Sequence, residues 1–203
     1  MGEGLSAERM VTADRDRVLA AIYIDTFGSR VNGKTKCLEC QQPFEIEFQL
    51  PELQQHLESS AAGTVEESGI YCLDECEFRL PTGEDELAIA GLQATEAVNA
   101  LLQLCVVSGG KQQGEKIQEA MSGIAPVIQT EIKTVCPECG HTQQARFDIQ
   151  SYLLSKLKEE QKQVYRDIHR LASSYKWSHR EILELPRRLR RSYVKMIEDE
   201  LTG

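Results

Sequence analysis

The sequence lacks the segments that export or membrane insertion require. The first residues, MGEGLSAERMVTADRDR, contain no basic start followed by an apolar run, and no later stretch approaches the length needed to span a bilayer. We therefore expect an intracellular, cytoplasmic protein. Reductants in that compartment keep thiols reduced, so the seven cysteines favour metal binding and buried thiols over disulfides.

The usual signatures of an enzyme are also missing. None of the histidines stands beside a Gly-framed serine or cysteine, and no glycine-rich loop suited to a phosphate is present. The many carboxylates fall on the polar faces of expected helices, where solvation explains them. These absences predict a protein without catalytic activity.

A strongly basic face is absent as well. Residues 1–150 hold 11 Lys/Arg against 24 Asp/Glu, a net charge of −13, whereas residues 151–203 hold 12 against 8, a net charge of +4. An acidic body repels the phosphate backbone of a nucleic acid. Only the mildly basic tail is suited to touching one.

Two Cys-x-x-Cys turns are the most specific feature that is present: Cys37 and Cys40 in CLEC, and Cys136 and Cys139 in CPEC. A closed structural zinc site needs four ligands, so the two turns together predict one structural zinc without an open position for a catalytic water. The alternatives are buried thiols or a redox dithiol. A thioredoxin-type motif, however, would stand at a helix start in a βαβ unit, a pattern that is absent here.

An internal repeat surrounds these turns, at an offset of 99 residues. The pairs at this offset are Cys37 with Cys136, Cys40 with Cys139, Phe48 with Phe147, Leu50 with Ile149 and Leu53 with Tyr152. After each turn comes a strand and then the start of a helix; PFEIEFQL shows the period-2 alternation of a half-buried strand, which Pro51 ends. QTEIKTV is the expected strand before the second turn. Two such arms facing one metal make a zinc-ribbon-like core.

The residues between the two turns are an expected insertion, which loop-closure entropy tolerates because it grows only logarithmically with length. ESSAAGTVEESG reads as a polar hinge, and GIYCLDECEFRLPTG as one strand or a hairpin. EDELAIAGLQATEAVNALLQLCVV predicts one or two helices, and KQQGEKIQEAMSGIAP a further amphipathic helical segment.

Helical patterns occupy both ends of the chain. Near the start, the spacing predicts a helix over 13–27, with Thr12 or Asp14 as its cap and Gly28 as its stop. In the tail, a helical stripe consists of Val164, Tyr165, Ile168, Leu171, Ala172 and Tyr175. SHRE is a capping box between Ser178 and Glu181, and Pro186 suits the first turn of a last helix. One face of that last helix is expected to consist of Leu189, Tyr193, Ile197 and Leu201.

The sequence thus predicts an α+β fold with a small zinc-ribbon-like β core, an inserted mostly helical lobe and a C-terminal helical tail. The expected parts are an N-terminal helix over 1–30, the core over 31–57 and 130–157, the lobe over 58–129 and the tail over 158–203.

Two further metal-binding patterns are weaker. His141, two residues after Cys139, is able in principle to replace a cysteine ligand, although a surface turn explains it more simply. Cys72 and Cys76 in YCLDEC could chelate a second metal with Cys105, but a Cys-x3-Cys spacing on a strand favours buried thiols.

The tail carries the residues that we expect to bind a protein partner, because arginine and aromatic side chains are enriched at protein interfaces. They are Tyr175, Trp177, Arg187, Arg188, Arg190 and Arg191. PRRLRRSYVK also suits phosphates, and the helices around SHRE have the size of a helix-turn-helix. The acidic chain and the small number of clustered arginines favour a protein over DNA.

Several segments in order resemble the baseplate proteins of contractile-tailed phages and related injection systems, which are grouped with the T-even phage baseplate hub assembly proteins. The segments are FGSRV, CLEC with FEIEFQL, FRLPTGEDEL, CPECGHTQQARFDIQSYLL and DIHRLASSYKWSHREILELPRRLRRSYVKMI. The resemblance covers residues 13–200, and its most specific parts are FRLPTGEDEL and the tail block.

The resemblance implies a non-enzymatic role in building the baseplate, through binding to hub, spike or wedge proteins. It leaves open whether the chain is a transient assembly factor or a structural part retained in the finished tail. Two other classes remain as alternatives: a zinc-ribbon regulator that binds nucleic acid, and a thiol-switch chaperone that releases zinc on oxidation.

Overall fold

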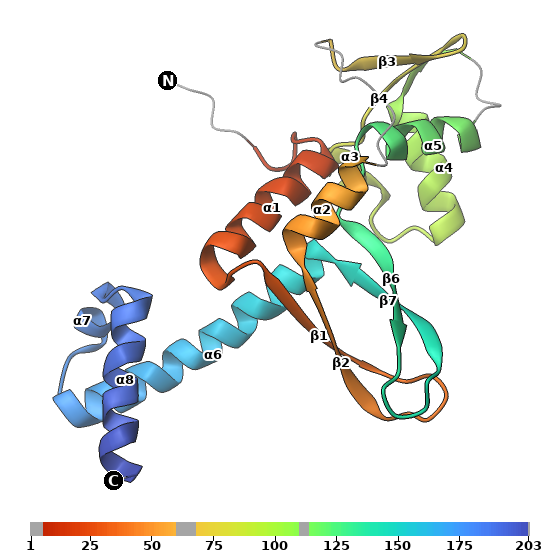
Figure 1. Cartoon of the computed structure of the whole chain (residues 1–203). Helices are drawn as coiled ribbons and strands as arrows, with labels where there is room; N and C mark the ends of the chain where they lie inside the picture. The colour runs from red at the N-terminus through yellow and green to blue at the C-terminus, as the bar shows by residue number, and fades with distance from the viewer. Residues whose placement is uncertain (1–5, 60–67, 110–113, 203) are drawn as a thin grey trace, which may run out of the picture. The chain divides into compact units, whose positions relative to one another are not determined.

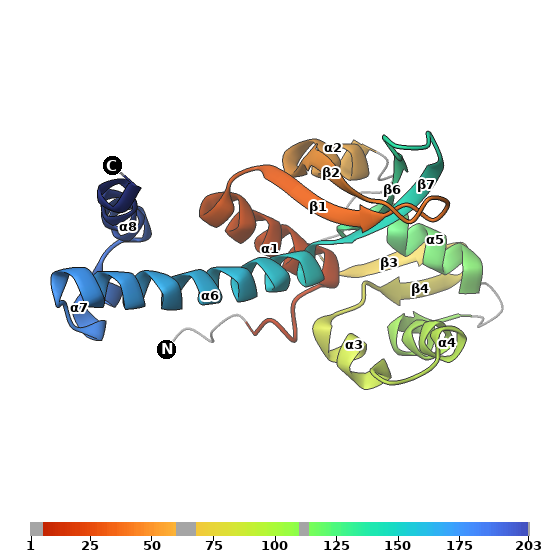
Figure 2. The same ribbon diagram turned by 90° about the horizontal axis from the view of Figure 1, so that it is seen from below.

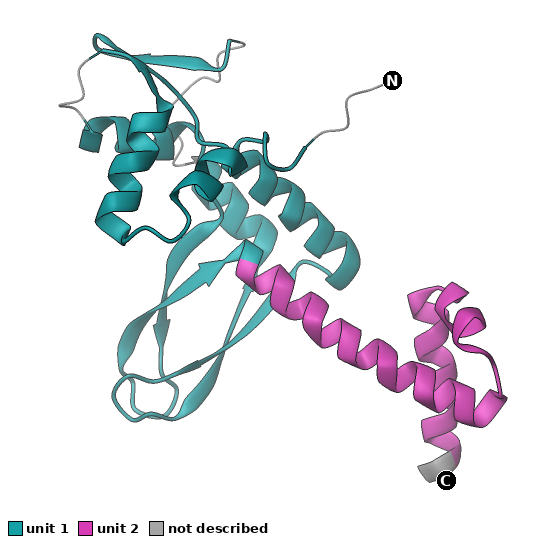
Figure 3. Ribbon diagram, turned by 180° about the vertical axis from the view of Figure 1, so that it is seen from behind, with its two compact units in different colours: residues 1–150 teal, residues 151–203 magenta. Residues whose placement is uncertain are grey.

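The computed structural model describes residues 6–59, 68–109 and 114–202. The chain forms two compact units, Met1–Gln150 and Ser151–Gly203, which Figure 3 distinguishes by colour. The fold is a mixture of helices and small antiparallel sheets (Figure 1). Most of the polar hinge predicted over 58–69 lies outside the described residues.

Helix α1, Thr12–Phe27, opens the first unit and ends at Gly28, as its sequence predicts. Gly28 adopts a φ of 95°, in the region that glycine enters at little cost. The predicted side-chain cap is wrong, because the residue before the helix is Val11, which offers none. The amide of Thr12 instead donates to the carbonyl oxygen of Pro81, so the inserted segment supplies the acceptor.

Two β-hairpins carry the internal repeat. Strands β1, Arg30–Lys36, and β2, Pro43–Gln49, pair antiparallel, as do β6, Gln129–Val135, and β7, Thr142–Asp148. Each strand of the second hairpin begins and ends 99 residues after the corresponding strand of the first. Helix α2, Leu50–Ser59, follows the first hairpin directly, and α6, Ile149–Tyr175, follows the second.

Strand β1 was not expected from the sequence, because RVNGKTK contains one apolar residue and no apolar alternation. Its buried residue is Val31, and pairing with β2 along its whole length holds the rest of the strand extended. The repeat was the available signal, since QTEIKTV precedes the second turn at the same offset.

The inserted lobe is a three-stranded sheet with helices packed against it (Figure 2). Strands β3, Ile70–Leu73, and β4, Cys76–Arg79, form the expected hairpin, and α3, Gly83–Ile89, and α4, Ala94–Cys105, are the expected helices. Strand β5, Val106–Ser108, was missed; it pairs with β4, so Val106 leaves the predicted helix. Helix α5, Gly114–Ile124, completes the lobe. The core consists of Tyr71, Cys76, Phe78, Leu80, Cys105, Ile117 and Met121.

A buried carboxylate fixes α1 to the two segments that flank the second hairpin. The carboxylate of Asp16 is 1% exposed, and it accepts hydrogen bonds from the amide of Ile128 and from the side-chain amide of Gln150, each at 3.0 Å. Burial raises the pKa of Asp16, while these two hydrogen bonds oppose the rise. Because the carboxylate spans 112 residues of sequence to reach Ile128, it holds together segments that lie on either side of the lobe.

Replacing Asp16 by alanine is therefore expected to destabilise the first unit by about 1–3 kcal/mol, the usual cost of leaving a buried amide such as that of Ile128 unpaired. Asp16→Asn keeps an acceptor for Ile128 and removes the buried charge. Since the raised pKa makes ionisation unfavourable in the folded state, the charge costs stability as pH rises through the folded pKa, and the asparagine variant is expected to lose that dependence. Urea unfolding at several pH values, followed by circular dichroism, measures both effects; equal losses in the two variants would contradict this account.

The second unit contains most of α6 and two further helices, α7, His179–Glu184, and α8, Arg187–Thr202. Ser178 and Glu181 form the predicted capping box before α7. Helix α6 runs without a break through the core–tail boundary predicted at residues 157 and 158. The core of this unit is formed by Leu171, Ile182, Val194 and Ile197.

Two residues of the predicted apolar stripes of the tail helices are exposed. Leu189 is 43% exposed and Tyr165 is 59% exposed. The buried side of α8 instead contains Arg190, beside Val194 and Ile197. A charged residue thus takes a core position that the apolar pattern did not reveal. The side chain of Leu201 lies outside the described residues.

Candidate metal centre

Each Cys-x-x-Cys turn closes a β-hairpin with the same backbone hydrogen bonds. The amide of Cys37 donates to the carbonyl oxygen of Gln42, and the amide of Gln41 donates to the carbonyl oxygen of Cys37, both at 3.0 Å. The second turn repeats this pattern through Cys136, His141 and Gly140. Gln41 and Gly140 occupy equivalent positions with φ values of 60° and 74°, so both turns close through a left-handed residue.

The two turns bring the predicted ligands together. The sulfur atoms of Cys37, Cys40, Cys136 and Cys139 all lie within 4.8 Å of one another. Cys37 Sγ lies 3.6 Å from Cys139 Sγ, and Cys40 Sγ lies 3.7 Å from Cys136 Sγ. A tetrahedron with metal–sulfur bonds of about 2.3 Å has edges of about 3.8 Å. The cluster is therefore compatible with a four-coordinate metal ion.

These contacts have the reciprocity of a two-fold axis. The first cysteine of each turn contacts the second cysteine of the other turn, as in a symmetric dimer interface. Phe48 packs edge-on against its own repeat equivalent, Phe147, at a centroid distance of 5.0 Å. The two halves of the repeat thus face each other across the sulfur cluster.

The two thiols of the first turn, Cys37 and Cys40, differ in how readily they ionise. Burial opposes ionisation of Cys37, but backbone amides of Cys40 and Glu39 donate to its sulfur, and its pKa falls to about 6. The amide of Gln42 favours the Cys40 thiolate, yet burial and the neighbouring sulfur atoms raise the pKa of Cys40 to about 12. Like charges at this separation oppose joint ionisation, so four thiolates need a cation between them.

Gln143 was not recognised from the sequence, and it supports the first turn. Its buried side-chain oxygen accepts the amide N–H of Leu38 at 2.8 Å, and its Nε2 donates to the carbonyl oxygen of Lys36 at 3.0 Å. Both partners flank Cys37. The repeat places Phe44 at the equivalent position of the first copy, so this support runs from the second hairpin to the first only.

Replacing Gln143 by alanine is expected to lower metal affinity by roughly tenfold or more, the usual effect of losing a group that orients a ligand. The amide of Leu38 and the carbonyl of Lys36 would lose their partner, and the turn around Cys37 would loosen. Competition with a chromogenic chelator measures the affinity. The exposed neighbour Gln144, replaced by alanine, is the control and should stay within twofold of the unmodified protein; the same result for Gln143→Ala would show that the contact is dispensable.

The weaker metal-binding patterns do not add to the cluster. Among the described residues, the four turn cysteines are the one group of three or more Cys, His, Asp or Glu side chains placed to hold a metal, and His141 is outside it. Cys76 and Cys105 are buried in the lobe core, and burial raises the pKa of Cys105 to about 11. Cys76 Sγ donates to the carbonyl oxygen of Ser108, while Cys72 is exposed. The structure thus places Cys76 and Cys105 as buried thiols.

The aromatic residues predicted to bind a partner pack on one another. The ring of Tyr175 stacks on Trp177 at 4.8 Å, and Tyr193 meets Trp177 edge-on at 5.1 Å. All three are partly buried against the core of the tail. Part of their surface therefore stabilises the tail itself.

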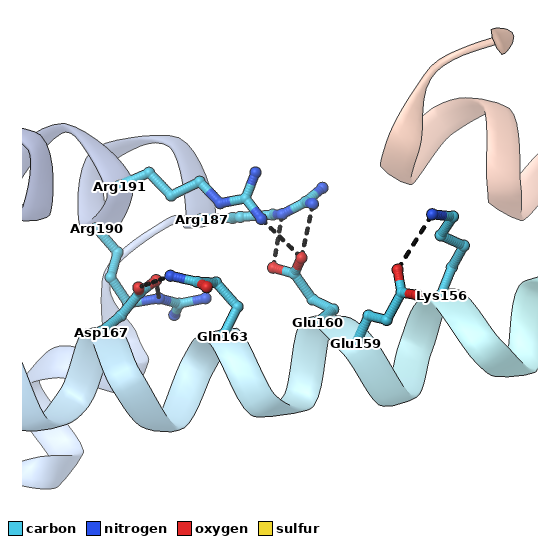
Figure 4. Close-up of polar contacts among 8 residues, drawn as sticks. All are labelled: Lys156, Glu159, Glu160, Gln163, Asp167, Arg187, Arg190 and Arg191. Carbon is cyan, nitrogen blue, oxygen red and sulfur yellow. Dashed lines mark hydrogen bonds and ion pairs between the residues drawn. The ribbon is translucent and has the colours of Figure 1, made fainter. Parts of the chain in front are cut away.

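Most of the predicted arginines are held by acids on α6 (Figure 4). Arg187 donates two hydrogen bonds of 2.8 Å to the carboxylate of Glu160, and Arg191 donates one of 2.7 Å to the same carboxylate. Arg190 is buried, and its Nε atom lies 3.6 Å from Oδ2 of Asp167. Arg188 is exposed. Partner binding by these arginines remains a prediction, and the structure gives three of them a role within the tail.

Comparison of the chain with protein-family models, with curated proteins and with solved structures found no match. Among the described helices, none has both the length and the apolar content needed to cross a membrane.

Proposed function

We propose that the four turn cysteines bind one structural zinc ion. The observation that carries this proposal is the reciprocal sulfur geometry, with two cross-turn distances close to the edge of a zinc–thiolate tetrahedron. Thiolate ligands in a tetrahedral arrangement favour zinc over the harder cations. The ion would join two hairpins that are otherwise separate two-stranded sheets, and would make them the two arms of a zinc-ribbon-like core.

On this scaffold, the chain acts as a non-enzymatic binding protein in the assembly of a contractile tail baseplate. Four cysteine ligands would leave zinc no open position for a substrate, which supports a structural role. The resemblance of FRLPTGEDEL and of the tail block to baseplate hub assembly proteins supports the biological setting. The partners would be hub, spike or wedge proteins of a phage tail or of a related injection system.

The test is affinity purification of the tagged protein from cells that make the particle, with zinc counted in the same sample. One zinc per chain together with hub, spike or wedge subunits is the expected result. Presence of the protein in finished particles would make it a structural part, and absence would make it an assembly factor. Recovery of nucleic acid without tail proteins would overturn the baseplate role and favour a zinc-ribbon regulator. Zinc release with cross-turn disulfides under mild oxidant would favour a thiol switch instead.

A further inference from the structure

Helix α6 uses one of its faces to hold α8. Glu160, Gln163 and Asp167 lie on this face and point toward α8 in Figure 4. Glu160 binds Arg187 and Arg191, and Asp167 accepts a hydrogen bond from Gln163 at 2.8 Å. Both acids on this face, Glu160 and Asp167, therefore already have partners within the tail.

A second, exposed side of α6 is mainly basic, and the one acid beside it, Glu159, pairs with Lys156. Lys158, Lys162 and Arg166 follow one another at intervals of four residues, so they form a row on one side of the helix. With a rise of 1.5 Å per residue, the row is about 12 Å long. Tyr165 lies beside it with 59% of its surface exposed. We call Lys158, Lys162, Tyr165 and Arg166 the basic row of α6.

The three cations of this row form no ion pair or side-chain hydrogen bond within the part of the chain that the structure describes. Two other exposed cations of the tail do: Arg170 pairs with Glu198, and Arg180 with Glu184 at 2.8 Å. Like charges four residues apart on a helix repel each other and destabilise it slightly. Ion pairing within the described part of the tail therefore gives the row no stability, and its like charges oppose the helix slightly.

We propose that the basic row of α6 binds a carboxylate-rich patch on the surface of a partner protein. Positive charges in a row match such a patch, and an exposed tyrosine among them supplies the apolar contact area that interface anchors provide. This proposal rests on the proposed role as a binding protein, and it moves the contact from the arginines of α8 to the outward face of α6.

A protein patch fits better than a nucleic acid. Residues 1–150 carry a net charge of −13, so a long polyanion bound to the tail would meet repulsion from the rest of the chain. A patch of a few carboxylates carries far less charge than a long polyanion, so it meets less of this repulsion. Three cations would also release few counterions from a nucleic acid, which leaves little driving force for binding.

The test places a photo-crosslinking amino acid at Tyr165 in the full chain, in cells that make the particle. The expected product is a crosslink to a baseplate subunit, at a peptide that contains several Asp or Glu residues. Charge reversal of the row, Lys158→Glu with Lys162→Glu and Arg166→Glu, is expected to lower the yield at least about tenfold, since like charges would then face each other. The matched control is Lys176→Glu with Lys195→Glu, two exposed cations of the tail that belong neither to the row nor to the predicted partner-binding residues, and it should leave the yield unchanged.

Trp177 fluorescence shows whether each variant keeps the folded tail, because Trp177 is the only tryptophan in the chain. A crosslink to nucleic acid or to a second copy of this chain would overturn the proposal. So would normal particle assembly by the folded triple variant without any crosslink. A charge-dependent crosslink to an acidic protein outside the baseplate would keep the binding row and refute the baseplate role, so the two failures are distinguishable.

Discussion

Replacing Cys136 by serine is expected to remove the metal and to unfold the two hairpins. A structural zinc contributes on the order of 10 kcal/mol to the folding of small zinc modules, which is comparable to the whole stability of a typical domain. Cys136 is buried, and its sulfur contacts that of Cys40 across the two turns. A serine oxygen there would be a poor ligand with no partner of its own.

The matched control is Cys72→Ser, because Cys72 is an exposed cysteine outside the sulfur cluster. Its expected effect is within about 0.5 kcal/mol, as for most surface substitutions. Zinc content by elemental analysis and urea unfolding by circular dichroism separate the two variants. If Cys136→Ser kept one zinc per chain, or lost zinc while the hairpins stayed folded, the structural role of the metal would be refuted.

The internal repeat explains why the sequence predicted that the four turn cysteines come together. The cysteine spacing and the equivalent Phe48 and Phe147 were visible as a pattern, and the structure brings the members of that pattern together. Gln143 was not predictable in the same way. It acts through a contact with Leu38, 105 residues away, and the repeat offered no signal because Phe44 stands at its equivalent position.

The lobe and the tail show a second limit of predicting structure from local sequence patterns. Strand β5 exists because it pairs with β4, although its residues continue the apolar pattern of α4. In the tail, the helical stripe of α6 and the capping box at Ser178 were readable locally. The pairing of Arg187 with Glu160 joins residues 27 positions apart. A cluster of arginines looks the same in sequence whether its partner belongs to the same chain or to another.

Replacing Asp167 by alanine is expected to destabilise the tail by about 3 kcal/mol. Asp167 is 1% exposed and Arg190 is 7% exposed, and removing one member of a buried ion pair leaves the other charge without compensation. Gln163 would also lose the acceptor for its side-chain amide. Urea unfolding followed by the fluorescence of Trp177 measures the effect, because Trp177 packs against the core of the tail.

The decisive comparison is a double variant, Asp167→Leu with Arg190→Leu. Replacing a whole buried pair by apolar side chains is often neutral or stabilising, so the double variant is expected to recover most of the stability that Asp167→Ala loses. Recovery would show that the pair is kept for a reason other than stability, such as fixing the register of α8 against α6. A fixed register would keep the basic row of α6 exposed. A double variant as unstable as the single one would instead show that the ion pair itself holds the two helices together.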